Sequence, residues 1–462
     1  MIFPPPEHSG LLTDLYELTM AAAYFESGKS QESATFELSI RSLPAPRSFL
    51  LAAGLEQAVR YLEHLSFEDS EIDYLRQHPA FENVKASFFD FLADLHFTGT
   101  VWALPEGTAV FAEEPLLRVT APIVEAQIAE TYLLSMLTYQ TSVATKAARM
   151  VRAAAGRGVV EFGTRRAHGP SAGLLAARAS YIGGCLGTSN VLAGFALGIP
   201  TYGTAAHSWI MSFEDEEEAF RKFAAIYGPR AVLLIDTYDS EEGARKALGL
   251  GLPFRGVRLD SGNFQELSRR VRKILDAGGR TDAVIMASGD LNEYLIEKLA
   301  EANAPIDLFG VGTDLVTSRD APSLSGVYKM VEMETRGHVR YTAKFSESKV
   351  SYPGKKQVYR FSRPGGEYAR DVLALASESF ADAEPLLELV MENGISVSPL
   401  PSLKQIQERA AASLSRLPQG VQRLHAPDQF PVEKSSGLQS LLESVRTRYV
   451  AVPAGTAGTG IP

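Results

Sequence analysis

The sequence predicts an α/β fold built around a parallel sheet, either a (β/α) barrel or an open doubly wound sheet, with an additional α+β domain. Two observations support this prediction. Short β-rich runs recur about every 20 to 40 residues between residues 159 and 333, with helical patterns between most of them. Several runs are almost uninterrupted apolar stretches, as expected of parallel strands that are buried on both faces.

Most of the expected strands end in glycine or in polar residues. The runs are VVEFGTR (159–165), IPTYGT (199–204), AVLLIDTYD (231–239), GVRLDSG (256–262), AVIMASGD (283–290), DLFGVGTD (307–314) and VYKMVEM (327–333). The helix expected after the fourth run has clear end signals, because Asn263 can cap its start and Gly278 with Gly279 can end it. Active sites in both candidate folds lie at the carboxyl ends of the strands, so we expect the functional side chains there.

Residues 1–140 have a different pattern. Helical periodicity at 14–27 and 68–96 alternates with β-like segments at 33–44 and 99–111, which is typical of an α+β domain. A chain of 462 residues has room for two or three folding units of about 150 residues.

The other boundaries follow from where the strand-and-helix rhythm begins and stops. Long helical periodicity at 123–155 leads into the barrel region, which we place at 141–354. Residues 355–450 show mostly helical patterns with proline breaks, and we expect part of this region to complete the N-terminal domain. Residues 451–462 lack apolar periodicity, so we expect a flexible tail there.

The composition excludes several classes of function. Lys and Arg number 45 against 55 Asp and Glu, a formal net charge of -10, which argues against a surface that neutralises nucleic-acid phosphates. The single cysteine, Cys185, can form neither an internal disulfide nor a cysteine-based zinc site. No run approaches the roughly 18 apolar residues of a membrane span. We therefore expect a cytoplasmic protein with no nucleic-acid or membrane partner.

The first expected strand ends in a segment suited to a flat anion. In EFGTRRAHGP (161–170), the aromatic ring of Phe162 lies three residues before Arg165. A guanidinium can pair with a carboxylate while an aromatic ring stacks on a planar ligand. This segment is therefore a candidate for binding a flat, negatively charged ring.

A histidine follows the second expected strand. In GTAAHSW (203–209), His207 lies just past the strand end, and a neutral imidazole is a good nucleophile toward phosphorus. Asp236, at the end of the next run, is a carboxylate that could orient His207. The pair predicts a nucleophile and its orienting acid.

The later strand ends add a charged pair and two turns that could bind phosphate. Arg258 and Asp260 are two residues apart, so they lie on one face of a strand. A charged pair that faces the interior of a barrel is costly to desolvate without ligands. The glycine-containing turns contribute Gly289, Asp290, Gly310, Gly312 and Thr313, whose backbone N–H groups could cradle a phosphate.

Taken together, these motifs resemble the nicotinate phosphoribosyltransferase family. The resemblance rests on TDLYELTM (13–20), EFGTRRAHGP, GTSN (187–190), GTAAHSW, RLDSG and FGVGTDLVTS, and covers roughly residues 10 to 350. It implies a type II phosphoribosyltransferase fold, with an irregular α/β barrel, an α+β domain and a homodimer whose active sites are shared. It also implies the conversion of nicotinate, 5-phosphoribosyl 1-diphosphate (PRPP), ATP and water to nicotinate mononucleotide, diphosphate, ADP and phosphate, in NAD biosynthesis.

The resemblance also implies a role for each candidate residue. Tyr16 would stack on the pyridine ring opposite Phe162, from the neighbouring subunit, and His207 would be the phosphorylated histidine with Asp236 as its partner. The other residues implied to contact nicotinate or the reacting centre are Arg165, Ser189, Thr204, Arg258 and Asp260. The residues implied to bind phosphates are Gly289, Asp290, Gly310, Gly312, Thr313, Arg41, Arg319, Lys329, Lys344 and Lys349. Mg²⁺ is expected to bind mainly through diphosphate oxygens and water.

Other functions remain open at this point. Enzymes that use nicotinamide carry an aspartate where this chain has Ser189, which favours nicotinate here because a second anion would repel its carboxylate. Quinolinate is a third possible substrate on the same fold. A barrel aldolase would place a Schiff-base lysine at a strand end, and the runs from 159 to 314 contain none. A non-catalytic barrel that binds PRPP is the remaining alternative.

Overall fold

The computed structural model describes residues 7–346 and 349–450, and its contacts divide the chain into two compact units. Unit 1 contains residues 140–323 and 402–411, and unit 2 contains the other described residues. The tail expected at 451–462 lies outside the described residues. Residues 324–354, which we expected in the barrel, belong to unit 2.

Unit 1 is built on a parallel sheet with the strand order β6-β10-β9-β8-β7. Its strands are β6 (Gly158–Glu161), β7 (Val232–Leu234), β8 (Gly256–Leu259), β9 (Val284–Gly289) and β10 (Leu308–Val311). Parallel bridges join Glu161 to Thr188 and Thr188 to Thr201, so the chain passes two further strand positions between β6 and β7.

The order of these positions is the order of a barrel. From β6 the neighbours are Thr188 and Thr201 on one side and β10, β9, β8 and β7 on the other, which follows the sequence around a ring. Within the described residues no ladder joins Thr201 to β7, so the barrel is irregular. The expected strand at 199–204 is reduced to a single bridge, and the strand position at Thr188 was not expected.

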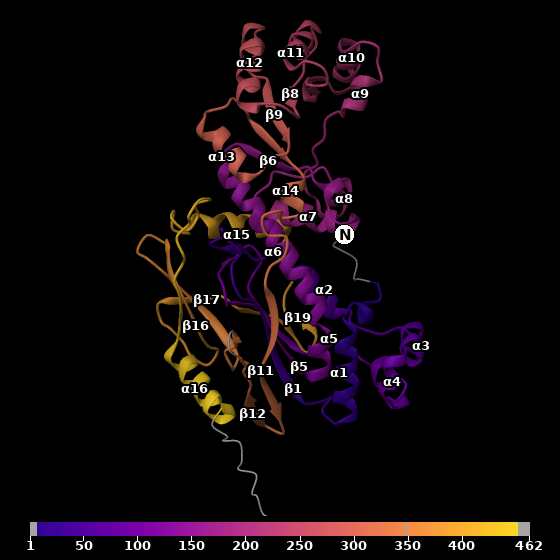
Figure 1. Cartoon of the computed structure of the whole chain (residues 1–462), viewed down its shortest axis with the longest axis vertical. Coiled ribbons are helices and arrows are strands. Elements are labelled where there is room, and N and C mark those ends of the chain that lie inside the picture. The colour runs from indigo at the N-terminus through magenta and orange to yellow at the C-terminus, as the bar shows by residue number, and fades with distance from the viewer. Residues whose placement is uncertain (1–6, 347–348, 451–462) are drawn as a thin grey trace, which may run out of the picture. The chain divides into compact units, whose positions relative to one another are not determined.

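Helices follow most of the strands of unit 1, and α10, α11 and α12 lie side by side (Figure 1). The helices that follow β6 and the two bridges are α7 (Pro170–Ile182), α8 (Val191–Leu197), α9 (His207–Met211) and α10 (Glu216–Tyr227). The later helices are α11 (Ser240–Gly249), α12 (Phe264–Ala277), α13 (Glu293–Glu301) and α14 (Thr313–Val316). The expected cap is confirmed, because the side chain of Asn263 accepts a hydrogen bond from the backbone N–H of Glu266 at the start of α12.

Unit 2 contains a seven-stranded sheet in the order β12-β11-β1-β5-β3-β18-β19. Its strands are β1 (Ser33–Ile40), β3 (Thr100–Ala103), β5 (Pro115–Pro122), β11 (Gly326–Thr335), β12 (His338–Tyr341), β18 (Glu388–Glu392) and β19 (Ile395–Ser396). The expected seventh barrel strand, 327–333, is β11, so that prediction is wrong. β11 pairs antiparallel with β1, and its mixed apolar and polar pattern fits a half-buried antiparallel strand equally well.

Most helices of unit 2 lie where helical patterns were expected, at 14–27, 68–96 and 123–155, whereas α2 (Leu55–Glu63) was not expected. The others are α1 (Leu15–Glu26), α3 (Asp69–Gln77), α4 (Ala86–Ala93), α5 (Ile123–Ile128), α6 (Glu130–Ala153) and the C-terminal α16 (Ser436–Val450). The 24-residue helix α6 begins in unit 2 and ends in unit 1. Within the described ranges, no helix is both long enough and apolar enough to cross a membrane.

The C-terminal region is not mostly helical, contrary to expectation. It forms β15 (Lys356–Ser362), β16 (Tyr368–Leu375), β17 (Ala383–Pro385), β18, β19, α15 (Leu403–Ser415), β20 (Val432–Lys434) and α16. Arg360 of β15 and Asp371 of β16 face each other in register and form a buried ion pair of 2.5 Å. These buried charges interrupt the alternation of apolar and polar residues by which a strand is recognised.

Candidate active site

Arg258, near the end of β8, is the centre of the site in unit 1. Its Nε donates to Ser288 Oγ at 2.7 Å, its Nη1 to Thr204 Oγ1 at 2.9 Å and its Nη2 to Asp260 Oδ1 at 2.5 Å. The guanidinium carbon lies 5.8 Å from the centre of the Phe162 ring. One largely buried cation therefore brings together four of the expected strand ends.

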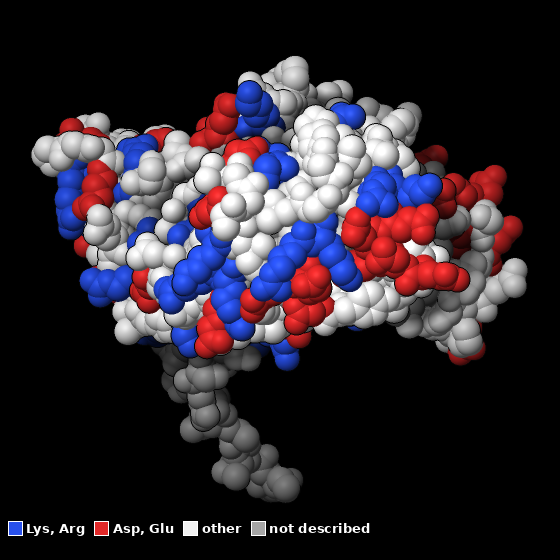
Figure 2. Space-filling view, turned by 90° about the horizontal axis from the view of Figure 1, so that it is seen from above, with Lys and Arg blue, Asp and Glu red and all other residues white. Residues whose placement is uncertain are grey.

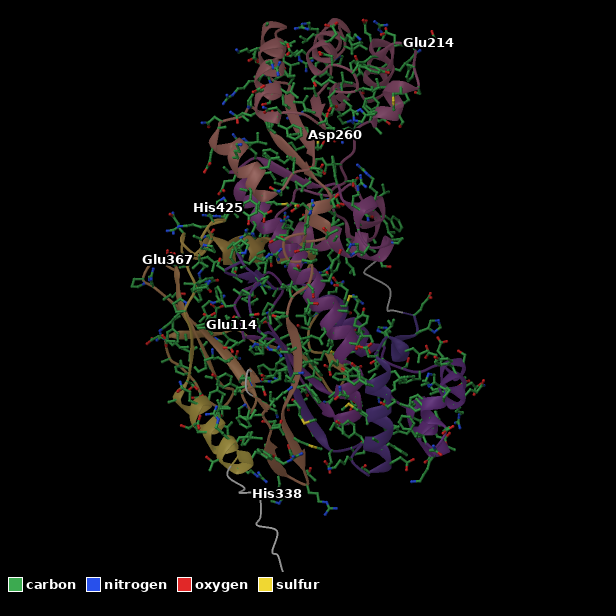
Figure 3. All side chains as sticks on the ribbon, viewed as in Figure 1. Glu114, Glu214, Asp260, His338, Glu367 and His425 are labelled. Carbon is green, nitrogen blue, oxygen red and sulfur yellow. The ribbon has the colours of Figure 1, made fainter. Side chains whose placement is uncertain are left out.

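Asp260 lies just past the end of β8 (Figure 3). Burial alone would raise the pKa of its carboxyl, but a hydrogen bond from Ser288 and the charge of Arg258 outweigh it and lower the pKa below its ordinary value. Ser288 Oγ donates to Asp260 Oδ1 at 2.5 Å. The carboxylate is therefore held ionised and fixed in place at neutral pH.

His207, the first residue of α9, has two neighbours that hold its ring. Its Nδ1 lies 3.1 Å from Thr237 Oγ1, and its Nε2 lies 3.7 Å from Asp260 Oδ2. The His207 side chain is 38% exposed, so a ligand can reach it. The ring is thus placed between a hydroxyl and a carboxylate at the mouth of the barrel.

The expected contact between His207 and Asp236 is corrected by the structure. Asp236 Oδ2 instead accepts hydrogen bonds from the backbone N–H of Asp260 at 2.8 Å and from Ser261 Oγ at 2.9 Å. The neighbouring residue Thr237 makes the contact with the imidazole. Asp236 therefore acts on His207 only indirectly, by fixing the backbone of Asp260, whose carboxylate faces the imidazole.

Two glycines at the expected phosphate turns are required by geometry. Gly289 has a φ of +114°, and a Cβ there would lie 2.4 Å from the backbone oxygen of Asp260. A Cβ on Gly310 would lie 2.7 Å from the ring of Phe162. Gly312 and Thr313 form the start of α14. The glycines let the turns approach the charged pair and the aromatic ring closely.

A cavity of about 400 Å³ opens beside the charged pair. Asp260 and Asp290 line it, together with the first residues of α12 and with Lys298 of α13. Arg165 is exposed in the short 3-10 helix Thr164–Arg166, and it makes no ion pair with any residue that the structure describes. Arg319 is also exposed. These groups are available to an anionic ligand.

Unit 2 carries the other expected site residues. Tyr16, on α1, is 46% exposed. Arg41, Lys329 and Lys344 line one pocket of about 90 Å³, and none of them forms an ion pair within the described part of the chain. Lys349 belongs to the two-residue strand β14 (Lys349–Val350), but its side chain is outside the described structure. Three unpaired cations around one pocket are suited to an anion.

Lys356 and Glu37 also line this pocket of unit 2. Lys356 Nζ lies 2.7 Å from Glu37 Oε2, and both side chains are buried. Because this cation is already neutralised, the unpaired side chains carry the excess positive charge of the pocket. On the face shown in Figure 2, by contrast, basic and acidic side chains are interspersed and form no single basic field.

Glu17 follows Tyr16 and is fully buried. Burial raises the pKa of its carboxyl to about 8, with smaller contributions from the charges of Glu130 and Asp14, although a hydrogen bond from Thr131 opposes this shift. Thr131 Oγ1 donates to Glu17 Oε1 at 2.8 Å. The Glu17 carboxyl is therefore mostly protonated at neutral pH.

We expect Glu17 to make the folded protein less stable as the pH rises. Between the ordinary pKa of 4.5 and the folded value of about 8, the folded state binds a proton that the unfolded state has lost, so stability falls across this window. The effect of one linked proton is up to about 1.4 kcal/mol per pH unit. The melting temperature of Glu17→Gln should therefore rise relative to that of the wild type between pH 5 and pH 8. If the melting temperatures of the two proteins changed in parallel with pH, Glu17 would not be the group that takes up the proton.

The donor groups of unit 1 fit a magnesium ion that is held mainly by its ligand. Within the described ranges, no group of three or more His, Cys, Asp or Glu forms a ready-made metal site. Asp236 Oδ1 is buried and has no hydrogen-bond partner, and Asp260 and Asp290 line one cavity. Mg²⁺ typically takes one or two carboxylates and fills its shell with phosphate oxygens and water. The carboxylates present satisfy that requirement.

Sequence reasoning missed several residues of the site. Ser288 and Thr237 contact the charged pair and the histidine, and each lies next to a residue that the sequence did single out. Glu161 is fully buried at the end of β6, with Thr188 as a partner. A charged residue at the end of the apolar run VVE was the available signal for Glu161.

The barrel, its glycine turns and the charged groups at its strand ends define a type II phosphoribosyltransferase. The model of the quinolinate phosphoribosyl transferase C-terminal domain matches residues 143–321. The N-terminal and C-terminal domain models of nicotinate phosphoribosyltransferase match residues 11–138 and 379–442. The chain belongs to the nicotinate phosphoribosyltransferase family.

Individual relatives agree with this assignment. A nicotinate phosphoribosyltransferase of Mycobacterium tuberculosis is 42% identical over 95% of both chains, and that of Bacillus subtilis is 39% identical over 92% of both. The crystal structure of human nicotinic acid phosphoribosyltransferase superimposes with a TM-score of 0.83 at 31% identity, covering 94% of this chain and 100% of the human chain. The structure of nicotinate-nucleotide pyrophosphorylase from Pyrococcus furiosus gives a TM-score of 0.72 at 27% identity, covering 90% and 98%.

Proposed function

We propose that the chain is a cytoplasmic, ATP-coupled nicotinate phosphoribosyltransferase of NAD biosynthesis, which acts through phosphorylation of His207. The observation that supports this most directly is the placement of an accessible imidazole between Thr237 and Asp260, next to the Arg258 cluster. Family membership makes nicotinate and PRPP the expected substrates. The basic side chains and backbone N–H groups at the strand ends suit the carboxylate of nicotinate and the phosphates of PRPP.

Nicotinate is flat and carries one carboxylate. The Phe162 ring offers a stacking surface, and the unpaired guanidinium of Arg165 offers a counter-charge. Ser189, whose backbone N–H donates to the Glu161 carbonyl at 2.8 Å, adds no negative charge to this end of the barrel. These features favour a pyridine carboxylate over a carboxamide.

Transfer joins the pyridine nitrogen to C1 of the ribose while the bond from C1 to the diphosphate oxygen breaks. The carbon develops positive charge as diphosphate leaves, so a fixed carboxylate nearby stabilises the transition state. Asp260 has this property, because Arg258 and Ser288 hold its carboxylate ionised and in place. Mg²⁺, when bound by Asp260 and Asp290 together with diphosphate, would neutralise charge on the leaving group.

ATP is coupled to this transfer through the histidine. A ring nitrogen of His207 attacks the γ-phosphorus of ATP, ADP leaves, and water later hydrolyses the phosphohistidine to free phosphate. The contacts of the two ring nitrogens with Thr237 and Asp260 fix the ring for this attack. The phosphoryl group would bring negative charge to the mouth of the barrel. This charge would favour the productive arrangement of the site for transfer.

The decisive experiment is product analysis with nicotinate, PRPP, Mg²⁺ and ATP, each omitted in turn. Nicotinate mononucleotide and diphosphate should form only with nicotinate and PRPP, and ADP should form in step with product. Nicotinamide and quinolinate serve as alternative substrates in the same assay, and quinolinate use would release CO₂. Turnover of either in preference to nicotinate would overturn the proposal, as would tight PRPP binding without product.

We also propose that the enzyme is a homodimer in which Tyr16 and the cations around the unit 2 pocket serve the partner's barrel. The exposed ring of Tyr16 and the cations Arg41, Lys329 and Lys344 support this, because they lie in unit 2 and the three cations form no ion pair with any described residue.

Complementation tests the dimer directly. Tyr16→Ala and Asp260→Asn should each be nearly inactive alone, whereas their mixture after subunit exchange should recover about a quarter of the wild-type sites, since half of the dimers are mixed and each has one intact site. A mixture of Asp260→Asn with Arg258→Ala, two changes in the same barrel, is the matched control and should recover nothing. Equal recovery in both mixtures would contradict shared sites.

A further inference from the structure

Glu161 is a buried carboxylate to which the proposed mechanism assigns no role. It is the last residue of β6 and is 0% exposed. Its Oε1 accepts a short hydrogen bond from the backbone N–H of Gly163, and its Oε2 accepts another from Thr188 Oγ1. Within the described residues it forms no ion pair. The backbone N–H of Thr164 also stabilises the carboxylate, so dipoles rather than a cation balance its charge.

A buried carboxylate without a cationic partner does not help the protein to fold. Burial raises the pKa of the Glu161 carboxyl, and hydrogen bonds from Thr188, Gly163 and Thr164 only partly offset this shift. A neutral side chain of the same size would fill the space at a lower desolvation cost. The positions of these donors explain what the carboxylate achieves instead, because Gly163 and Thr164 belong to one loop and Thr188 belongs to another.

The first loop carries Phe162 and Arg165. The backbone N–H of Phe162 donates to the carbonyl of Val311 at 2.7 Å, which fixes the start of the loop on β10. Gly163 is buried so closely against Val316 that a Cβ there would lie 2.3 Å from it. The Gly163 N–H has the carboxylate of Glu161 as its acceptor. That bond sets the direction in which the chain leaves the strand toward Arg165.

The second loop is GTSN (187–190). Thr188 Oγ1 donates to the carboxylate and accepts the backbone N–H of Asn190 at 2.9 Å, and Asn190 Oδ1 in turn caps α8. The backbone N–H of Ser189 donates to the carbonyl of Glu161 at 2.8 Å. Glu161 therefore holds this loop through its side chain and through its backbone.

We propose that Glu161 is a positioning residue that fixes these two loops relative to each other and so sets the slot for the planar pyridine ring. This inference rests on the proposed function in one respect, namely that Phe162, Arg165 and Ser189 contact the pyridine substrate. Glu161 touches no substrate and acts only through the loops. Its loss should therefore weaken pyridine binding selectively and leave PRPP binding nearly unchanged.

Steady-state kinetics with both substrates tests the proposal. Glu161→Ala should raise the KM for nicotinate by about tenfold or more and change the KM for PRPP by less than about twofold, since misplaced binding groups act on the substrate that they contact. Glu161→Gln can offer its carbonyl oxygen to Gly163 and its amide to Thr188, so it should stay within about threefold of the wild type. Equal rises in both KM values, or no change in either, would overturn the proposal.

Thr188 provides variants that keep the buried carboxylate. Thr188→Val removes the hydroxyl that bridges the loops and should raise the nicotinate KM, whereas Thr188→Ser should restore it. Glu114 of unit 2 is the matched control for loss of a buried carboxylate (Figure 3), because it is also 0% exposed and accepts a backbone N–H, that of Phe111, at 2.8 Å. Glu114→Ala should leave the nicotinate KM unchanged. If Glu161→Ala fails to fold, the Thr188 pair decides the outcome.

Hydrogen exchange gives a readout that does not depend on activity. Glu161→Ala and Thr188→Val should speed amide exchange in peptides that cover 161–166 and 187–193, and Glu161→Gln should not. Unchanged exchange in both loops would overturn the positioning role. If the wild type used another pyridine, the proposed function would fail, but the loop exchange would still report on Glu161.

Discussion

Replacing His207 by alanine should abolish the phosphoenzyme and reduce ATP hydrolysis by at least about a hundredfold, while slow transfer from PRPP persists. The reason is that the variant removes the nucleophile for ATP but leaves the Arg258 cluster, the glycine turns and Asp260 intact. Labelled phosphate on the protein, ADP release and nicotinate mononucleotide formation, measured in parallel, separate the two reactions.

Two further variants sharpen this test. Thr237→Val keeps the imidazole but removes the hydroxyl that lies 3.1 Å from Nδ1, so phosphorylation should slow without disappearing. His338→Ala, on exposed β12 of unit 2, is the control for a histidine outside the barrel and should behave as the wild type (Figure 3). Full ATP coupling in His207→Ala would show that another residue carries the phosphoryl group.

Asp260→Asn should lower kcat by about a hundredfold to a thousandfold with both nicotinate and PRPP saturating. The substitution keeps the volume of the side chain but removes the charge that faces Arg258, Ser288 and His207. Single-turnover transfer in the absence of ATP measures this loss independently of the phosphorylation step.

The chain provides a close control for this substitution. Asp282 also follows an arginine at a spacing of two residues, and Arg280 Nε lies 3.1 Å from its Oδ1, but its side chain is 70% exposed. Asp282→Asn should therefore leave kcat unchanged, since exposed pairs of this kind contribute little. An Asp260→Asn variant with wild-type turnover would remove Asp260 from the reacting centre.

The barrel could be predicted because most of its strands are recognisable from local runs of apolar residues. Four apolar runs, from AVLLID to FGVG, became β7, β8, β9 and β10, and the polar ends of β8 and β9 meet at Arg258. β11 could not be assigned in this way, because its partner β1 is remote in the sequence and apolar periodicity does not reveal which sheet a strand joins. β15 and β16 were also missed, because the buried charges of Arg360 and Asp371 made their sequences look like polar segments.

The site shows the same limit at the level of single residues. Spacing placed Arg258 and Asp260 on one face, and the structure confirms their contact. Spacing did not show whether Asp236 or Thr237 would face His207, because that choice depends on the twist of a few residues after β7 ends. Glu161 went unnoticed because its partner Thr188 lies on another strand position and only the fold brings the two together.

The internal position of β1 in its sheet has a consequence for the synthesis of this protein. β1 has β5 on one side and β11 on the other, and β11 begins only at Gly326, after nearly all of unit 1 has been translated. At about 5–20 residues per second, one edge of β1 stays unpaired on the ribosome for roughly 15 to 60 seconds. An open edge in a hydrophobic sheet is prone to wrong pairing, so the nascent chain needs protection during this interval. A polypeptide truncated before β11 would leave this edge of β1 unpaired permanently.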